Sequence, residues 1–182
     1  HDSYELRGKT VGIVGGGAIG RMVMQRLQGW DCKLIYSDPY RMPEEMEKKL
    51  NCEYVSLETL LRESDVVSLH CPLTEQTRGM IGKEQLAMMK PNAIIVNEAR
   101  GAVIDDKALV EALQNGTIWG AAIDTWEKEP LDPNDPLVKM EKVITTSHLG
   151  VATRETVIRC FSIGYQNILR QIHGEELVNR IV

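Results

Sequence analysis

The sequence predicts an α/β fold in which helices cover both faces of a doubly wound parallel sheet of about seven strands. Short apolar segments alternate with helical patterns along most of the 182 residues, as in repeated strand–helix units. One of these segments, residues 93–96, is apolar at every position, which is typical of a strand covered on both faces. A glycine motif follows the first apolar segment and opens a helical pattern. Together these observations predict a Rossmann-like sheet.

Seven short segments rich in apolar and β-branched residues are expected to form the strands. The first contains Val11, Ile13 and Val14, and most of the others run into polar residues, Gly or Pro. In chain order the expected strands are residues 10–14, 32–38, 53–55, 64–69, 93–96, 118–123 and 143–146.

Helices are expected between these strands and after the last one. The first begins directly after the glycine motif. The others are expected at residues 43–50, 56–63, 83–89, 105–114 and 152–173. Asp105 or Asp106 is the N-cap of the fifth, and Gly174 ends the last. The last helix carries an apolar stripe at helical spacing, which we expect to pack in the core: Val157, Phe161, Tyr165, Ile168 and Ile172.

Composition argues against several classes of partner and site. The formal net charge is −5 and no block of Lys and Arg forms a basic stripe, which argues against nucleic acid or an anionic membrane as the main partner. No apolar run approaches the roughly 18 residues of a membrane span, and we recognise no secretory signal. The cysteines are scattered, so we expect buried free thiols in a reducing cytoplasm rather than disulfides or metal ligands: Cys32, Cys52, Cys71 and Cys160.

The motif Gly15-x-Gly17-x-x-Gly20 predicts a dinucleotide site because it stands between a strand and a helix. Gly15 permits a tight turn, Gly17 leaves room for a pyrophosphate, and Gly20 lets the helix pack closely on the strand. Free N–H groups at the start of the helix then bind the phosphates. The alternative is a glycine-rich turn without a ligand, which the two flanking elements disfavour.

Asp38 ends the second predicted strand, 18 residues beyond Gly20. This is close to the spacing of the carboxylate that accepts the adenosine ribose hydroxyls in dinucleotide sites. A carboxylate there repels a 2′-phosphate, so NAD is favoured over NADP. Two alternatives stay open: Asp38 as a turn residue before Pro39, and Arg41 as the partner of a 2′-phosphate.

Three charged or titratable residues, Arg100, Glu129 and His148, follow three successive strands. Because ligands bind where parallel strands end, we expect these residues to converge beside the glycine motif. A guanidinium binds a carboxylate in a fixed geometry, a histidine exchanges a proton with a hydroxyl near neutral pH, and a nearby carboxylate favours the imidazolium. Facing a nicotinamide, this set suits hydride transfer to a 2-hydroxy acid. His70, after the fourth strand, is interpreted as a packed residue rather than a catalytic one.

Over nearly its whole length the chain resembles the NAD-binding domain of the D-isomer-specific 2-hydroxyacid dehydrogenases, which include phosphoglycerate dehydrogenase. Several motifs, in order and with matching separations, carry this resemblance. They are Leu6-Arg-Gly-Lys-Thr10, Gly15 to Gly20, Tyr36-Ser-Asp-Pro-Tyr40, His70-Cys-Pro-Leu-Thr-x-x-Thr77-Arg-Gly-Met-Ile, Met89-Lys-Pro-Asn-Ala-Ile-Ile-Val-Asn97, Ala99-Arg100-Gly101, Ala121-Ala-Ile-Asp124, Glu129-Pro130 and His148-x-Gly150.

The resemblance implies an enzyme that transfers a hydride between NAD(H) and a small 2-oxo or 2-hydroxy acid, and a homodimer formed through this domain. Arg100 would bind the substrate carboxylate and carbonyl oxygen, His148 would be the general acid/base, and Glu129 would be its partner. The pyrophosphate would lie on Gly15, Gly17, Ala18, Ile19 and Gly20, and the adenosine ribose on Asp38. The rest of the cofactor cleft would be lined by Cys71, Pro72, Thr77, Glu98, Ala99, Arg100, Asp124, His148 and Gly150.

Three features depart from the family pattern. Ser147 stands where the family usually has Pro before the histidine, and Glu98 replaces a small residue. The family's substrate domain is built mainly from residues that precede this domain, and the chain begins at residue 1 without Met, so we expect a fragment or an excised domain. We interpret residues 1–9 as a lead-in from the substrate domain, 10–150 as the NAD-binding domain, and 151–182 as a long helix and the start of a return.

We therefore expect the chain to bind NAD(H) but to turn over 2-oxo acids poorly, because half of the cleft is absent. An alternative of a different class is an NADH-sensing interaction module, since the family includes transcriptional corepressors similar in sequence. An intact Arg100, Glu129 and His148 set favours the enzyme without excluding the module.

Overall fold

The computed structural model describes residues 4–179 and contains two compact units, one ending at Ser147 and one beginning at His148. The first unit holds a seven-stranded parallel sheet with its helices, so the predicted fold class is confirmed. The second unit holds one long helix, α6 (Arg154–His173).

The strands of the sheet follow the predicted segments closely. In chain order they are β1 (Thr10–Val14), β2 (Lys33–Ser37), β3 (Cys52–Tyr54), β4 (Val66–Leu69), β5 (Ile94–Asn97), β6 (Gly120–Ile123) and β7 (Val143–Thr145). They are arranged in the order β3-β2-β1-β4-β5-β6-β7, and every neighbouring pair is parallel. Strand β6 begins later than expected, because Ile118 is fully buried ahead of the strand and an apolar pattern does not separate such a residue from a strand.

The helices of the first unit also occupy the expected segments. They are α1 (Ala18–Arg26), α2 (Glu44–Leu50), α3 (Leu57–Glu63), α4 (Lys83–Met88) and α5 (Asp106–Gln114), with short 3-10 helices η1 (Gly101–Val103) and η2 (Pro136–Lys139). A carboxylate oxygen of Asp105 accepts a hydrogen bond of 3.1 Å from the N–H of Ala108, so Asp105 rather than Asp106 is the N-cap of α5.

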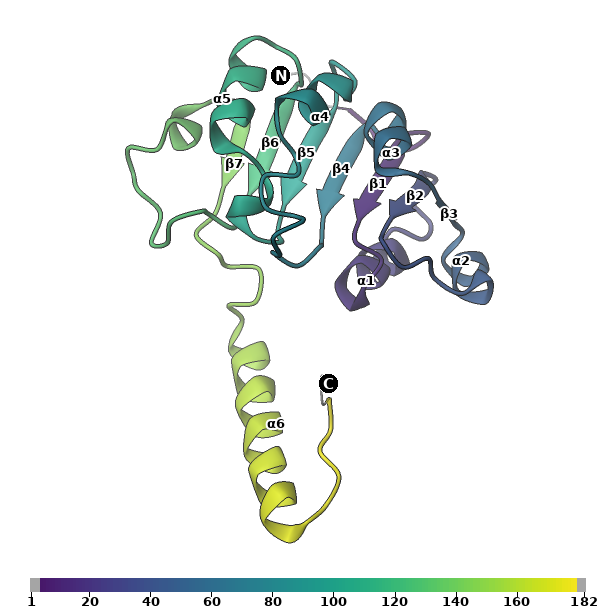
Figure 1. The fold of residues 1–182 in the computed structure, drawn as a ribbon, viewed down its shortest axis with the longest axis vertical. Helices are drawn as coiled ribbons and strands as arrows, with labels where there is room; N and C mark the ends of the chain where they lie inside the picture. Colours follow the sequence, from purple (N-terminus) through teal and green to yellow (C-terminus); the bar gives the residue numbers. More distant parts are fainter. Residues whose placement is uncertain (1–3, 180–182) are drawn as a thin grey trace. The chain divides into compact units, whose positions relative to one another are not determined.

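The core lies on both faces of the sheet, because successive strand residues point to opposite sides. On β1, Ile13 packs in one hydrophobic cluster with Met24 of α1. The next residue, Val14, belongs to a second cluster with Leu60 of α3 and Leu109 of α5. Helices therefore cover both faces, as the apolar strands predicted (Figure 1).

The order of the strands creates a switch point between β1 and β4. From β1 the chain proceeds to β2 and β3, and then returns to place β4 on the other side of β1 (Figure 1). Doubly wound sheets bind ligands outside the carboxyl ends of their strands at such a point. Gly15 follows β1 and His70 follows β4, so the glycine motif lies at the switch point.

The predicted core position of the apolar stripe on α6 is wrong. None of the residues of α6 is buried, and Phe161 in the middle of the stripe is 76% exposed. In the described part of this unit, the segment after the helix returns to it at Asn167, whose amide bonds the backbone of Val178. Helical spacing identifies which face of a helix is apolar, but it carries no information about what covers that face.

The cysteines depart from the prediction in their burial. All four are free thiols, but Cys32, Cys52 and Cys71 are only half-buried and Cys160 is exposed. Between residues 4 and 179, no helix combines the length and apolar character needed to cross a membrane.

Candidate functional site

The glycine loop after β1 is held in place by close backbone contacts. Gly15 has a φ of +106°, and a Cβ on it would lie 2.8 Å from the backbone nitrogen of Cys71. A Cβ on Gly20 would overlap the carbonyl oxygen of Gly15. At Gly17, by contrast, a Cβ would meet no described atom within 4 Å, and the residue is exposed. Gly15 and Gly20 are therefore required by the fold, whereas Gly17 leaves open space.

Asp38 lies beside this loop at the end of β2. One of its carboxylate oxygens accepts a hydrogen bond of 2.7 Å from the N–H of Gly16, and the other accepts one of 2.8 Å from the N–H of Tyr40. Each carboxylate oxygen retains a further acceptor position, because it has two lone pairs. Asp38 is therefore a loop-positioning residue that can still accept two ribose hydroxyl groups.

The start of α1 suits a diphosphate. Gly17, Ala18 and Ile19 are exposed there, and within the described chain no side chain caps the helix and no acidic residue lies in its first turn. The first N–H groups of a helix carry a partial positive charge and point along its axis. The open space at Gly17, the uncapped helix start and the nearby Asp38 together fit a dinucleotide.

The segment after β4 borders the same loop. The N–H of His70 donates to the carbonyl of Val14 at 2.7 Å, and the His70 ring pairs with Ser68 Oγ at 2.9 Å. Burial lowers the pKa of His70, so the ring is neutral at neutral pH. Thr77 Oγ1 donates to the carbonyl of Pro72 at 2.6 Å, which fixes the turn that follows. His70 is thus a packed residue, as interpreted from the sequence.

Arg100 lies in a turn that the Asn97 side chain stabilises through hydrogen bonds. The buried Asn97 side chain accepts from the N–H of Ala99 and donates to the carbonyl of Arg100, both at 3.1 Å. Ala99 is buried, whereas Glu98 and Arg100 are exposed. The Arg100 guanidinium donates to the carbonyl of Ala99 at 2.6 Å and keeps its remaining donors for other groups. Asn97 is a positioning residue that was not identified from the sequence. An amide side chain at the end of an apolar strand can nevertheless indicate a residue that bonds the turn after the strand.

The loops that carry Arg100 and Glu129 meet at Trp126. A Cβ on Gly101 would overlap the carbonyl carbon of Trp126, so the turn after Arg100 lies directly against this backbone. The N–H of Trp126 donates to Glu129 Oε1 at 3.2 Å, and its indole N–H donates to the carbonyl of Thr146 at 2.8 Å. Trp126, also missed from the sequence, therefore connects the ends of β5, β6 and β7.

Asp124 joins the same strand ends. Its N–H donates to the carbonyl of Asn97 at 3.0 Å, and its carboxylate accepts a hydrogen bond of 2.5 Å from Thr146 Oγ1. The residue is buried. Asp124, Arg100 and Glu129 are thereby brought to one edge of the sheet within the first unit.

His148 and Gly150 belong to the second unit. His148 is half-buried with a φ of +58°, and Gly150 is exposed. The pairing of His148 with Glu129 stays a prediction from the sequence.

Comparison with known proteins identifies the family. Residues 1–150 match the model of the D-isomer specific 2-hydroxyacid dehydrogenase family, NAD binding domain. The chain belongs to this family. The recognition made from the sequence motifs is therefore confirmed, and the domain is of the NAD-binding type.

Relatives in this dehydrogenase family cover almost all of the chain. A glyoxylate reductase from Korarchaeum cryptofilum is 48% identical over 98% of the chain and 54% of its own length. A D-3-phosphoglycerate dehydrogenase from Archaeoglobus fulgidus is 38% identical over 97% of the chain and 33% of its own length. Among solved structures, D-lactate dehydrogenase with NAD+ from Lactobacillus jensenii has a TM-score of 0.91 and 34% identity, over 100% of this chain and 58% of that one. The chain spans about half the length of the glyoxylate reductase.

Proposed function

We propose that this chain binds NAD(H) across the carboxyl edge of its sheet and forms the cofactor half of a D-2-hydroxyacid dehydrogenase. One observation carries the proposal: the residues suited to the cofactor and those suited to the substrate follow parallel strands that end at one edge of the sheet. Asp38 bonds the glycine loop at the switch point, and the Arg100 and Glu129 loops meet at Trp126.

The cofactor site follows from the loops at that edge. The N–H groups of Gly17, Ala18 and Ile19 bind the pyrophosphate, between Gly15 and Gly20, and Asp38 accepts the adenosine ribose hydroxyls. The remaining lining residues are proposed as in the family: Cys71, Pro72, Thr77, Glu98, Ala99, Arg100, Asp124, His148 and Gly150.

The proposed reaction assigns one task to each polar residue. When bound, NAD(H) supplies or accepts a hydride at C4 of its nicotinamide. Arg100 binds the substrate carboxylate through parallel N–H donors and polarises the adjacent carbonyl. During reduction His148 donates a proton to the carbonyl oxygen, and during oxidation it removes the hydroxyl proton. Glu129 is the partner of His148 and holds its ring in place.

Titration of the 182-residue chain with NADH tests the cofactor half of the proposal. We expect saturable binding at one site, measured by the change in NADH fluorescence. Absence of binding by a folded chain would overturn the proposal. In the same solution we expect slow oxidation of NADH by glyoxylate or hydroxypyruvate. Rapid turnover would contradict the expectation that half of the cleft lies outside this chain.

The substrate class is a small 2-oxo or 2-hydroxy acid. Relatives are named as glyoxylate reductases, D-3-phosphoglycerate dehydrogenases and a glyoxylate/hydroxypyruvate reductase. These names define the panel of acids to assay first. They are all names of enzymes, so the relatives give no support to the NADH-sensing interaction module.

A homodimer and a cytoplasmic location complete the proposal. The dimer is proposed from the family resemblance, and the four free cysteines support a reducing compartment. Light scattering of the purified chain tests the dimer, and a monomer at high protein concentration would contradict it.

A further inference from the structure

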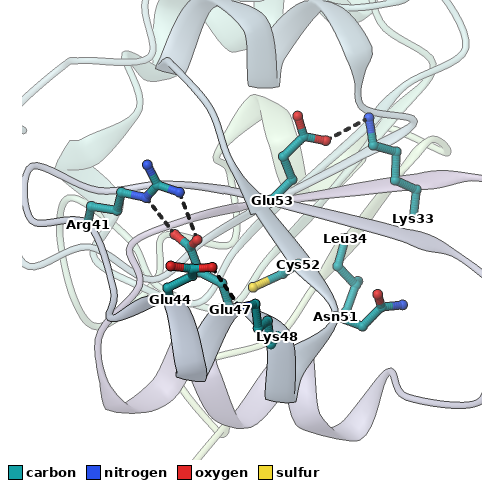
Figure 2. A pocket seen from close by; sticks show the side chains of 9 residues that line it. All are labelled: Lys33, Leu34, Arg41, Glu44, Glu47, Lys48, Asn51, Cys52 and Glu53. Atoms are coloured by element: carbon teal, nitrogen blue, oxygen red, sulfur yellow. Dashed lines mark hydrogen bonds and ion pairs between the residues drawn. The ribbon is translucent and has the colours of Figure 1, made fainter.

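A charged surface pocket of about 510 Å³ lies against β2, α2 and β3 (Figure 2). Its cations are already paired. The Lys33 ammonium lies 3.3 Å from Glu53, and the Lys48 ammonium lies 2.7 Å from Glu44. Arg41 forms an ion pair with Glu47, and Figure 2 marks the contacts between them with dashed lines. Among the described residues that line the pocket, every Lys and Arg therefore has an acidic partner. Of these cations, Arg41 lies nearest to Asp38 in the sequence.

Glu47 holds Arg41 through two parallel hydrogen bonds. Arg41 Nε donates to one carboxylate oxygen and a terminal guanidinium nitrogen donates to the other, each at 2.9 Å. The Glu47 carboxylate also accepts a hydrogen bond of 2.6 Å from the hydroxyl of Tyr36, and its side chain is only 9% exposed. The guanidinium lowers the pKa of Glu47 to about 2, so the carboxylate is ionised at neutral pH.

Tyr54 links this pair to Asp38, the expected ribose residue. Arg41 follows Asp38 by three residues and is the only Lys or Arg between residues 38 and 43. Its guanidinium lies 5.5 Å from the centre of the Tyr54 ring, and the Tyr54 hydroxyl donates to the carbonyl of Asp38 at 3.2 Å. The Tyr54 side chain therefore contacts both the guanidinium and the backbone of the residue that would meet the ribose.

We propose that Glu47 is a positioning residue for cofactor specificity, which disfavours NADP(H) by holding Arg41 away from the 2′-phosphate. The inference rests on the proposed NAD(H) site at Asp38 and adds a second determinant to that carboxylate. Asp38 repels the 2′-phosphate, and Glu47 withholds the cation that would neutralise it. NADH carries a hydroxyl at this position, so neither effect acts on it.

The arrangement is difficult to open because Glu47 is nearly buried. Moving Arg41 toward a phosphate would leave the Glu47 carboxylate with the hydrogen bond from Tyr36 but without a neutralising charge. A charge that loses its partner in a poorly hydrated place is costly. Arg41 is therefore retained by the protein even though its own side chain is 62% exposed.

A cycle of variants measured with NADH and NADPH tests the inference. Asp38→Asn removes the repelling charge and keeps an oxygen for the N–H of Gly16. Glu47→Gln removes the charge that holds Arg41 and keeps an acceptor for Tyr36. We expect the combined variant to bind NADPH about tenfold more tightly, relative to NADH, than Asp38→Asn alone. Adding Arg41→Gln to the combined variant abolishes that gain, and added salt reduces it.

The outcomes separate the two proposals. If the folded wild-type chain does not bind NADH, the proposed function and this inference both fail. If NADH binds but Glu47→Gln leaves the ratio of NADPH to NADH affinity unchanged in the Asp38→Asn background, the inference alone is overturned. A purely structural role for Glu47 would lower the thermal midpoint and weaken both cofactors equally. If Glu47→Gln does not fold, Arg41→Gln in the wild-type background provides the test. We expect it to change the NADPH dissociation constant less than twofold. A larger loss of NADPH affinity overturns the inference.

Discussion

The carboxylate of Asp38 accepts a hydrogen bond of 2.7 Å from the backbone N–H of Gly16, across 22 residues of sequence. This bond joins the end of β2 to the glycine loop after β1, and the two segments are the ribose and pyrophosphate regions of the proposed site. The residue proposed to select the cofactor thus also fixes the loop proposed to bind its phosphates. A change at Asp38 is therefore expected to affect both the fold and the binding of NAD(H).

We expect Asp38→Ala to destabilise the chain by about 1–2 kcal/mol, because two backbone N–H groups lose their acceptor. NADH affinity should fall by about ten- to a hundredfold, since the ribose hydroxyls lose a charged acceptor. Urea unfolding and NADH titration measure the two effects. Asp38→Asn is the intermediate variant: its single oxygen can accept from the N–H of Gly16 but not also from that of Tyr40, so it should recover only part of the lost stability. Equal NADH affinity in Asp38→Ala and wild type would contradict the proposed ribose contact.

Gly17→Ala and Gly20→Ala separate binding from folding within one loop. A Cβ at position 17 meets no described atom within 4 Å, so the thermal midpoint should stay close to that of the wild type. NADH affinity should fall at least about tenfold, because the methyl group occupies the space proposed for the pyrophosphate. At position 20 the methyl group overlaps the carbonyl of Gly15, which should cost about 1–3 kcal/mol of stability. Unchanged NADH binding by Gly17→Ala would exclude a close approach of the cofactor there.

The strands, the glycine loop and the family can all be predicted from the sequence, because each depends on local pattern. Val11 and Ile13 mark a buried strand, and Gly15 with its φ of +106° occupies a turn that other residues rarely adopt. Asp105 is one of two candidate N-caps in the sequence, because capping is also a local effect.

What cannot be predicted depends on contacts between distant segments. Trp126 acts through Gly101 on one side and Thr146 on the other, and no local spacing signals those contacts. In the sequence Glu47 is one of several acidic residues in a charged surface helix. Its hydrogen bonds to Tyr36 and Arg41 distinguish it only in the structure. The core position predicted for the apolar stripe on α6 is wrong. Periodicity indicates which face of a helix is apolar, but it does not indicate which residues pack against that face.

Trp126→Phe tests the connection between the strand ends. An aromatic ring is retained, but the carbonyl of Thr146 loses the indole N–H, so we expect a loss of about 1 kcal/mol. The backbone N–H that donates to Glu129 is unchanged, and NADH affinity should therefore remain near the wild-type value. Trp30→Phe is the control, since Trp30 is 58% exposed and its change should fall within about 0.5 kcal/mol. Urea unfolding measures both, and equal stabilities of the two variants would contradict the role of the indole.

Glu47 should make the chain sensitive to acid. Its pKa is about 2 in the folded state, against an ordinary value of 4.5, because Arg41 and Tyr36 bond the ionised form. A lowered pKa contributes stability that is fully present above about pH 4.5 and is lost as the pH falls toward 2. We expect the stability difference between wild type and Glu47→Gln to shrink across this range, as measured by urea unfolding at several pH values. A difference that is independent of pH would contradict the ion pair.

Asp106 should have the opposite dependence on pH. Burial, together with the negative charges of Asp135, Glu127 and Asp105, raises its pKa from 3.8 to about 6. The folded chain therefore binds a proton in the range from about pH 6 to pH 4 where the unfolded chain does not, so stability falls as the pH rises through this range. Because the side chain is only partly buried, solvent screening reduces the effect to about 1–2 kcal/mol.

Asp106→Asn should remove this dependence on pH. The stability of Asp106→Asn relative to the wild type should therefore be greater above pH 7 than at pH 4. Glu84→Gln, which removes a carboxylate from the first turn of α4, controls for the general effect of such a charge at a helix start. If Asp106→Asn and Glu84→Gln changed stability equally at every pH, as measured by urea unfolding, the crowding of carboxylates around Asp106 would have no energetic consequence.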